Sequence, residues 1–190
     1  MICCQTCTAR SSRSIFSRRT ILAALASAAA LPAARYARAQ AGSTDTAAAE
    51  DEGFMRLALD EARQGDFPFG AVIVREGRVI ARGHNVGRTT RDPTAHGEMV
   101  ATHRCLADHG TAALVGSTLY TSGEPCAMCM GAILWCRIGR LVFAASVQQL
   151  ATKIDQIMIS SADIAAKAPF APITIRGGVL ADEAMQLFAK

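Results

Sequence analysis

Phe69-Gly70-Ala71-Val72-Ile73-Val74 is the stretch that decides the fold, because it is a continuous apolar run rich in β-branched residues. Such a run predicts a strand. Glu76-Gly77 predicts a tight turn directly after it, and residues 78–82 predict the returning strand. The sequence therefore predicts a β-hairpin from which a larger sheet can be built.

Helical and strand patterns alternate on both sides of this hairpin. Before it, Phe54, Leu57, Ala58 and Ala62 share one face of a helix that begins near residue 51, and Gly65 ends that helix. After it we expect a polar loop at 85–92, helices at 93–108, 126–136 and 180–190, strands at 118–121, 141–144 and 173–175, and a partly helical stretch at 149–160. This alternation predicts an α/β domain whose sheet is covered on both faces.

Residues 1–39 have the composition of an export signal. Arg18-Arg19 precedes an Ala-rich apolar run, and Ala37-Arg38-Ala39 supplies the small residues that a signal peptidase accepts. The two arginines resemble a twin-arginine signal, and the apolar run is too short to span a membrane. We expect a signal peptide at 1–39, a flexible linker at 40–50 and one domain at 51–190, located in the periplasm or secreted, with no membrane anchor after cleavage. The alternative is a disordered N-terminus.

The formal charge of the whole chain is +4, from 20 Lys+Arg and 16 Asp+Glu. Residues 1–39 contribute six arginines and no acid, so the remainder holds 14 basic and 16 acidic residues, a charge near −2. Proteins that bind nucleic acid usually carry a basic surface for the phosphates. The charge of the remainder counts against a nucleic-acid partner.

Two short segments carry residues with the chemistry of a metal site: Asp92-Pro93-Thr94-Ala95-His96-Gly97-Glu98 and Glu124-Pro125-Cys126-Ala127-Met128-Cys129. One imidazole and two thiolates are three zinc ligands, so a tetrahedral ion keeps a position open for water. Glu98 lies two residues after His96, where its carboxylate could take a proton from that water. We predict that His96, Cys126 and Cys129 bind zinc and that Glu98 carries the proton.

Each motif alone has other interpretations. Cys-x-x-Cys also occurs in redox pairs and in structural zinc sites, and His-x-Glu often occurs by chance. The combination, with a proline before the first cysteine, favours a catalytic zinc over these alternatives. Cys105 and Cys136 are expected to be small buried side chains rather than a disulfide.

His-x-Glu followed by Pro-Cys-x-x-Cys is the signature of zinc deaminases that act on cytosine or adenine. From about Phe54 to Ala145 the chain resembles the cytidine deaminase superfamily, in the branch that holds bacterial guanine deaminases and tRNA adenosine deaminases. The matching segments are 68–74, 83–85, 92–96, 119–122 and 131–135. The resemblance implies a three-layer α/β/α sandwich around a five-stranded mixed sheet, zinc as the cofactor, and a homodimer.

The resemblance also suggests substrate contacts. Asn85 would hydrogen-bond the polar edge of the ring, and Trp135 would lie against the base. Gly97 stands where this branch usually has Ala, and it would leave its backbone N–H available to a substrate oxygen. The alternative for Asn85 is an ordinary loop residue that caps a turn, and the alternative for Trp135 is core packing.

The sequence favours hydrolytic deamination of a small free base or nucleoside, with guanine preferred. The acidic Phe-Asp-Asp stretch of guanine deaminases is absent, however, and Asp155 is the nearest acid. Residues 177–183 are instead similar to the end of tRNA adenosine deaminases, and a tRNA-specific adenosine deaminase is the first alternative. Export and the charge near −2 count against it. The second alternative is a non-catalytic zinc-binding protein, and an intact Glu98 counts against that.

Overall fold

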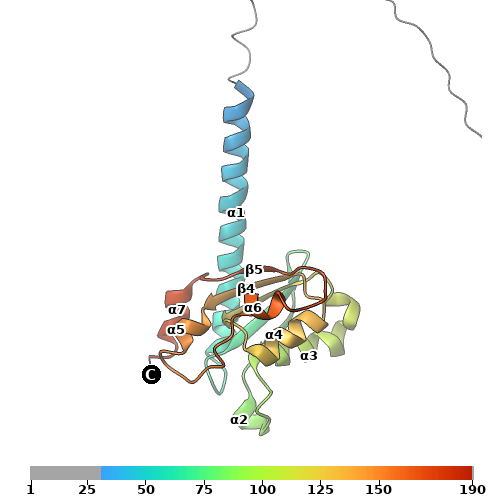
Figure 1. The fold of residues 1–190 in the computed structure, drawn as a ribbon, viewed down its shortest axis with the longest axis vertical. Coiled ribbons are helices and arrows are strands. Elements are labelled where there is room, and N and C mark those ends of the chain that lie inside the picture. Colours follow the sequence, from blue (N-terminus) through green and yellow to red (C-terminus); the bar gives the residue numbers. More distant parts are fainter. Residues whose placement is uncertain (1–30, 190) are drawn as a thin grey trace, which may run out of the picture. The chain divides into compact units, whose positions relative to one another are not determined.

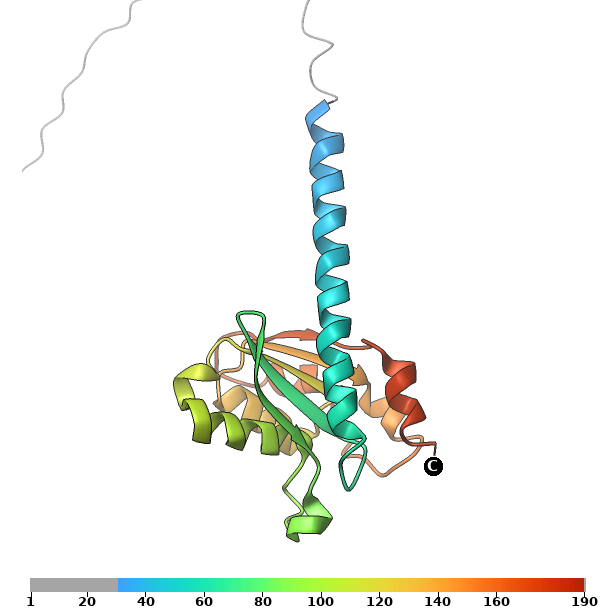
Figure 2. The same ribbon diagram turned by 180° about the vertical axis from the view of Figure 1, so that it is seen from behind.

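The computed structural model describes residues 31–189, and the side chains of residues 46–189. The chain divides into two units, Met1–Gln40 and Ala41–Lys190, and the second unit contains the whole sheet (Figures 1 and 2). Its elements follow in the order α1 (Leu31–Ala62, which begins in the first unit), β1 (Gly70–Arg75), β2 (Arg78–His84), α2 (Gly87–Thr90), α3 (Gly97–His109), the 3₁₀ turn η1 (Thr111–Ala113), β3 (Thr118–Gly123), α4 (Ala127–Trp135), β4 (Arg140–Ala145), α5 (Val147–Leu150), α6 (Ser161–Ala165), β5 (Thr174–Arg176) and α7 (Ala181–Gln186).

The five strands form one mixed sheet in the order β2-β1-β3-β4-β5. The hairpin β1–β2 and the pair β1–β3 are antiparallel, whereas β3–β4 and β4–β5 are parallel. Glu76 and Gly77, in the hairpin turn, both have positive φ, as the two central residues of the favoured two-residue turn require. The predicted hairpin and the five-stranded mixed sheet are confirmed.

Side chains alternate between the two faces of the sheet, as the period of a strand requires. In β1, Ala71 and Ile73 pack into a core with α3 and α4, whereas Val72 and Val74 pack into a second core with α1 and α7. Figures 1 and 2 show these helices on opposite sides of the sheet. The α/β/α sandwich predicted from the resemblance is therefore confirmed.

The N-terminal region differs from the expectation. Residues 40–50, predicted to be a flexible linker, are part of helix α1. Residues 1–30, with the arginine pair Arg18-Arg19, lie outside the described residues. The division into signal, linker and domain stays a prediction. Over the described part of the chain, the structure contains no helix that is both long and apolar enough to cross a membrane.

The predicted helix at 93–108 starts later than expected, at Gly97. Asp92 explains the delay, because its Oδ1 accepts hydrogen bonds from the backbone N–H of Thr94 at 2.8 Å and from the Thr94 hydroxyl at 2.6 Å. This side-chain turn competes with the first helical turn. The expected loop at 85–92 also contains one turn of helix, α2.

The stretch at 149–160, predicted to be partly helical, is mostly irregular. Its only helical residues belong to α5, which ends at Leu150, and the chain runs without regular structure from 155 to 160. Helix α6 was not predicted. The last helix, α7, is shorter than the predicted 180–190.

Candidate metal centre and substrate cavity

The two motifs meet because their strands end at the same edge of the sheet. Gly70, the first residue of β1, pairs with His84 at the end of β2, and Ala71 pairs with Thr121 near the end of β3. The chain leaving β2 and the chain leaving β3 therefore emerge at the same end of the sheet, on either side of β1. Each turns into a helix whose N-cap residue is a metal-ligand candidate, His96 for α3 and Cys126 for α4.

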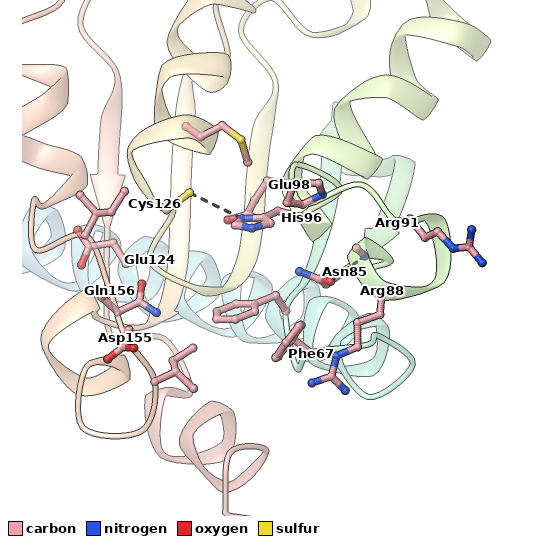
Figure 3. A pocket seen from close by; sticks show the side chains of 16 residues that line it. Phe67, Asn85, Arg88, Arg91, His96, Glu98, Glu124, Cys126, Asp155 and Gln156 are labelled. Atoms are coloured by element: carbon pink, nitrogen blue, oxygen red, sulfur yellow. Dashed lines mark hydrogen bonds between the residues drawn. The ribbon is translucent and has the colours of Figure 1, made fainter.

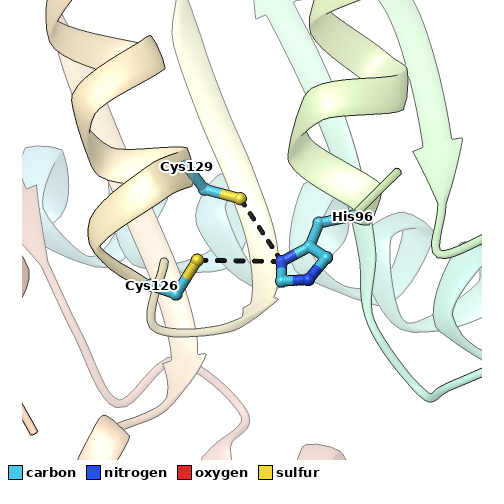
Figure 4. Close-up of side chains that lie close together, drawn as sticks. All are labelled: His96, Cys126 and Cys129. Atoms are coloured by element: carbon cyan, nitrogen blue, oxygen red, sulfur yellow. Dashed lines mark hydrogen bonds between the residues drawn. The ribbon is translucent and has the colours of Figure 1, made fainter. Parts of the chain in front are cut away.

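The three predicted ligands form one compact cluster (Figure 4). Nδ1 of His96 lies 3.7 Å from Sγ of Cys126 and 3.6 Å from Sγ of Cys129. All three ligand atoms lie within 4.8 Å of one another. A tetrahedral zinc ion with ordinary bond lengths would separate a nitrogen ligand from a sulfur ligand by about 3.6 Å. The donor set and its spacing fit zinc.

The electrostatics of the cluster suit a cation. The hydrogen bond with Cys129, together with the neighbouring His96, lowers the pKa of Cys126 to about 4. The same thiol–thiolate pairing, together with burial, raises the pKa of Cys129. The hydrogen bond with Cys126 raises the pKa of His96. The lowered pKa of Cys126 favours its thiolate form, which is the form in which cysteine binds zinc.

A cavity of about 730 Å³ opens in front of the cluster (Figure 3). Such a volume is typical of small-molecule sites. Glu98, in the first turn of α3, is only 4% exposed and lines this cavity together with His96 and Cys126. Burial raises the pKa of the Glu98 carboxyl group, so its affinity for a proton is increased. A proton acceptor and a metal centre thus share one enclosed space.

Asn85 lies in the wall of the cavity on the β2 side and is 5% exposed. Its Oδ1 accepts the backbone N–H of Gly87 at 3.1 Å, so it does cap a turn, as the alternative interpretation proposed. That bond orients the amide and leaves the Nδ2 donors for the cavity, where Figure 3 shows the side chain. Both roles considered for Asn85 are compatible with this geometry.

The model of the cytidine and deoxycytidylate deaminase zinc-binding region matches residues 48–145, which is half of the chain. The chain belongs to this deaminase family. Zinc is thus the expected metal, in agreement with the His-Cys-Cys cluster.

Relatives of this deaminase-family chain fall into two groups. The chain is 38% identical to the chloroplastic tRNA(adenine(34)) deaminase of Arabidopsis thaliana over 72% of its length, although this covers only 12% of that protein. It is 41% identical to the tRNA-specific adenosine deaminase of Bacillus subtilis and 43% identical to the guanine deaminase of the same organism, in both cases over 50% of its length. The matches cover 62% and 64% of these two relatives.

The similar solved structures also include both a tRNA deaminase and a guanine deaminase. A tRNA:A34 deaminase studied for A-to-I editing at the wobble position superposes with a TM-score of 0.62 and 33% identity, covering 71% of this chain and 98% of that one. The guanine deaminase from Nitrosomonas europaea superposes with a TM-score of 0.64 and 26% identity, covering 73% and 82%. The family is therefore established, while its members differ in substrate.

Two predicted substrate contacts, Trp135 and Gly97, are not among the residues that line the cavity. Trp135 is 75% exposed and packs edge-on against Phe170, with ring centroids 4.9 Å apart. It neither lines the cavity nor fills the core, because it lies at the far end of α4 from the ligand cysteines. Gly97 is buried at the start of α3, against the backbone of Phe69 and Gly70. In the described chain Trp135 therefore makes no contact with the cavity, whereas the predicted contact of the Gly97 backbone N–H stays a prediction.

The cavity also contains residues to which the sequence assigned no role. Arg88 and Arg91 lie at the rim, Glu124 lies beside the ligand cysteines, and residues 154–157 form the wall on the C-terminal side. Glu124 was visible in the Glu-Pro-Cys motif, but nothing indicated what its carboxylate would bind. Residues 154–157 come from the irregular stretch, where no periodic pattern indicates burial. Cys105 and Cys136 are free thiols, as expected.

Proposed function

We propose that this chain is a zinc-dependent hydrolytic deaminase that removes the exocyclic amine of a nucleobase-type ring. The proposal rests on one observation: the cluster of His96, Cys126 and Cys129 lies at a cavity that Glu98 also lines. A structural zinc site would need neither a buried carboxylate beside it nor an adjoining cavity. The family match supports the same reaction class.

The residues of the site account for the proton transfers that hydrolysis needs. Replacing a ring C–NH₂ by C=O consumes one water, so a proton must leave the water and another must reach the departing amine. When bound by His96 and the two cysteines, zinc supplies a Lewis acid that lowers the pKa of water towards neutrality. Glu98 can accept the first proton and return it to the amine, and its raised pKa favours both steps near neutral pH.

As substrate we propose a free purine base or a nucleoside, with guanine preferred. The cavity has the volume of a small-molecule site, and its wall combines apolar side chains with polar groups such as Asn85 and Gln156. The net charge near −2 outside residues 1–39 supports a small substrate over a polyanion. The 43% identity to a guanine deaminase supports the same choice.

A tRNA adenosine is the second candidate, and a specific observation favours it. Arg88 and Arg91 are exposed at the rim of the cavity, where the phosphates of a polynucleotide would pass. The relatives that act on tRNA point the same way.

The experiment that tests both candidates is ammonia release by the zinc-loaded chain. The panel contains guanine, adenine, cytosine, their nucleosides and a tRNA anticodon stem-loop. Turnover of guanine supports the first candidate, and turnover of the stem-loop alone supports the second. Absence of ammonia from every member would contradict the deaminase proposal.

We further propose that the protein is a homodimer, as the family resemblance implies. Exposed large apolar side chains outside the cavity support an interface, because Trp135 on α4 is 75% exposed and Met158 is 61% exposed. Sedimentation of the wild-type chain and of Trp135→Glu tests this proposal, with a monomeric variant as the expected result.

Export to the periplasm or beyond is a separate proposal. It is supported by the composition of residues 1–39, with consecutive arginines before an apolar run. Fractionation of cells that produce the full chain tests it. Replacing Arg18 and Arg19 by lysine should retain the protein in the cytoplasm, and unchanged export would exclude the twin-arginine route.

A further inference from the structure

The carboxylate of Glu124 holds two distant points of the chain. Its Oε2 accepts the backbone N–H of Val147 at 2.9 Å, and its Oε1 accepts the backbone N–H of Ser161 at 2.8 Å. All three residues are buried, with exposed fractions of 6%, 1% and 0%. Charge-assisted hydrogen bonds in a buried setting are strong and geometrically specific. Glu124 therefore fastens the segment 147–161 at both of its ends.

The middle of that segment has few other attachments. Helix α5 ends at Leu150, and residues 151–160, here named the wall segment, carry the chain to α6. Within the described residues, the backbone of 155–158 makes a single hydrogen bond, in which Ile157 O accepts the N–H of Ile159. The position of the wall segment thus depends on its two ends, and Glu124 bonds the residue that anchors each end, Val147 and Ser161. The capping box of α5 and the buried Leu150 also hold the first end.

The wall segment faces the proposed reaction centre. Ile154, Asp155, Gln156 and Ile157 line the cavity that His96 and Glu98 also line. Figure 3 shows Asp155 and Gln156 on the side of the cavity opposite Asn85. A ring that reaches Glu98 would therefore lie between Asn85, which follows β2, and the wall segment.

Gln156 has the chemistry of a substrate contact. Its side chain is partly buried in the cavity wall, and within the described part of the chain its amide has no hydrogen-bond partner. A primary amide offers two donors and an acceptor, while the edge of an amino-substituted heterocycle alternates between donors and acceptors. Asn85 is already committed in part, because its Oδ1 accepts the backbone N–H of Gly87. Among the described residues, Gln156 therefore offers the cavity an amide whose donors and acceptor are all unpaired.

We propose that Gln156 is a specificity-determining residue that hydrogen-bonds the heterocyclic substrate, and that Glu124 is a positioning residue that holds the wall segment in place. The inference rests on the proposed function and deepens it. It assigns recognition of the ring to two amides on opposite sides of the cavity, Asn85 from the strand side and Gln156 from the wall segment.

The first arm of the test is kinetic. Gln156→Ala is compared with Lys153→Ala, a matched change at an exposed position of the same segment that does not line the cavity. In the zinc-loaded full chain, ammonia release from the best substrate of the panel should show a KM about tenfold higher for Gln156→Ala, with kcat and zinc content unchanged. Lys153→Ala should match the wild type. An unchanged KM for Gln156→Ala, with unchanged preference between bases, would overturn the assignment of Gln156.

The second arm tests Glu124 without requiring turnover. In Glu124→Gln one acceptor oxygen becomes an NH₂ group that faces a backbone N–H, so one of the two attachments is lost. Hydrogen exchange should become at least about tenfold faster at Val147 or Ser161, and faster at residues 151–154, whose N–H groups are hydrogen-bonded, while zinc content and the exchange of β3 stay as in the wild type. The KM should rise as in Gln156→Ala, with little further increase in the double variant.

The outcomes separate the two proposals. If the wild type releases no ammonia from any substrate, the proposed function fails, while the exchange measurement still tests the attachment. Unchanged exchange in Glu124→Gln would overturn the positioning role. Loss of zinc with an unchanged KM would show instead that Glu124 acts on the loop of Cys126.

Discussion

At the scale of single residues, Glu98 carries the chemistry of the proposal. Its position two residues after His96 places it in the first turn of α3, in the wall of the cavity and beside the ligand candidate Cys129. Burial raises the pKa of Glu98, because a carboxylate with little contact with water holds a proton more readily. Glu98 differs in this respect from the exposed acids on the surface. The sequence was sufficient to predict its place in the first helical turn after His96.

Glu98→Gln should therefore lower kcat by about 10³-fold or more, because the amide cannot accept the proton from water. Zinc content, measured by atomic spectroscopy, should stay at the wild-type level. Glu76→Gln is the control, since that side chain is 86% exposed in the hairpin turn. Substantial activity in Glu98→Gln would contradict the proposed mechanism.

Removal of the metal should weaken the fold around the ligand cluster. Without the ion, the Cys126 thiolate and its neighbours are held together only by hydrogen bonds with His96 and Cys129. Chelation should lower the Tm by about 10 °C, since a ligand that binds only the folded state stabilises it by mass action. A His96→Ala variant should show a low Tm with or without chelator. If chelation lowered the Tm of His96→Ala as much as that of the wild type, the metal would have to bind elsewhere.

At the scale of elements, the sequence predicted the regular parts of the fold and missed the irregular ones. The run 69–74 has one dominant local preference and forms β1. The start of α3 was misplaced, because the side-chain hydrogen bonds of Asp92 decide it and periodicity does not register them. The wall segment was missed for a related reason, since its position depends on Glu124, which is distant in sequence.

For the candidate site, the sequence likewise predicted the residues that lie in the two motifs and missed those placed by packing or by loops. The ligands and Glu98 lie in two short motifs, and the strand edges bring those motifs together. Trp135 lies on the same helix as the cysteines, but its direction depends on how α4 packs, which the motif does not encode. Residues that enter the cavity from loops, such as Gln156, become recognisable only after folding.

The packing of α3 against the sheet leads to a prediction about Gly97. A Cβ atom there would lie 2.8 Å from the backbone oxygen of Phe69, so helix or strand must shift. Gly97→Ala should lower the free energy of unfolding by about 1–3 kcal/mol, despite the better helix propensity of Ala.

Gly53→Ala is the matched control, because Gly53 lies in α1 and a Cβ atom at this position would meet no other atom within 4 Å. That change should raise the free energy of unfolding by about 0.5–1 kcal/mol. Urea denaturation of both variants measures the two effects. Equal stabilisation by the two substitutions would show that α3 can move away from the strand at little cost.

At the scale of the whole domain, one buried carboxylate joins α1 to three strands. Asp51 accepts hydrogen bonds from Tyr120 of β3 at 2.8 Å, from both Nη atoms of Arg140 of β4 at 2.7 and 2.6 Å, and from Arg176 of β5 at 2.6 Å. Burial alone would oppose ionisation, but these bonds outweigh it and lower the pKa of Asp51 below 3.8. The cluster connects most of the sheet to one helix.

Asp51→Asn should cost about 1.5–3 kcal/mol of unfolding free energy at pH 7, because Asn loses the charge and one acceptor. Since the pKa of Asp51 is lower in the folded state than in the unfolded chain, its contribution is complete above the ordinary value of 3.8. It is lost as the pH falls further, through the folded pKa. The difference between wild type and variant should therefore shrink below pH 3.8.

Denaturant unfolding at pH 7, 5 and 3 measures this dependence. Asp60→Asn is the control on the same helix, because the Asp60 side chain is 60% exposed and pairs only with Arg63 of the next turn. It should change the stability by less than about 0.5 kcal/mol. A difference for Asp51→Asn that stays constant down to pH 3 would contradict the assignment of the charge.

The two hydrogen bonds of Glu124 also have an evolutionary consequence. They fix the ends of the wall segment, while its middle takes almost no part in the backbone hydrogen bonding of the domain. Insertions, deletions or replacements between those ends alter the shape of the cavity and leave the sheet and the zinc ligands undisturbed. Exchange of a single loop is thus a short route by which one deamination chemistry is transferred to a new heterocycle, in natural divergence and in protein engineering alike.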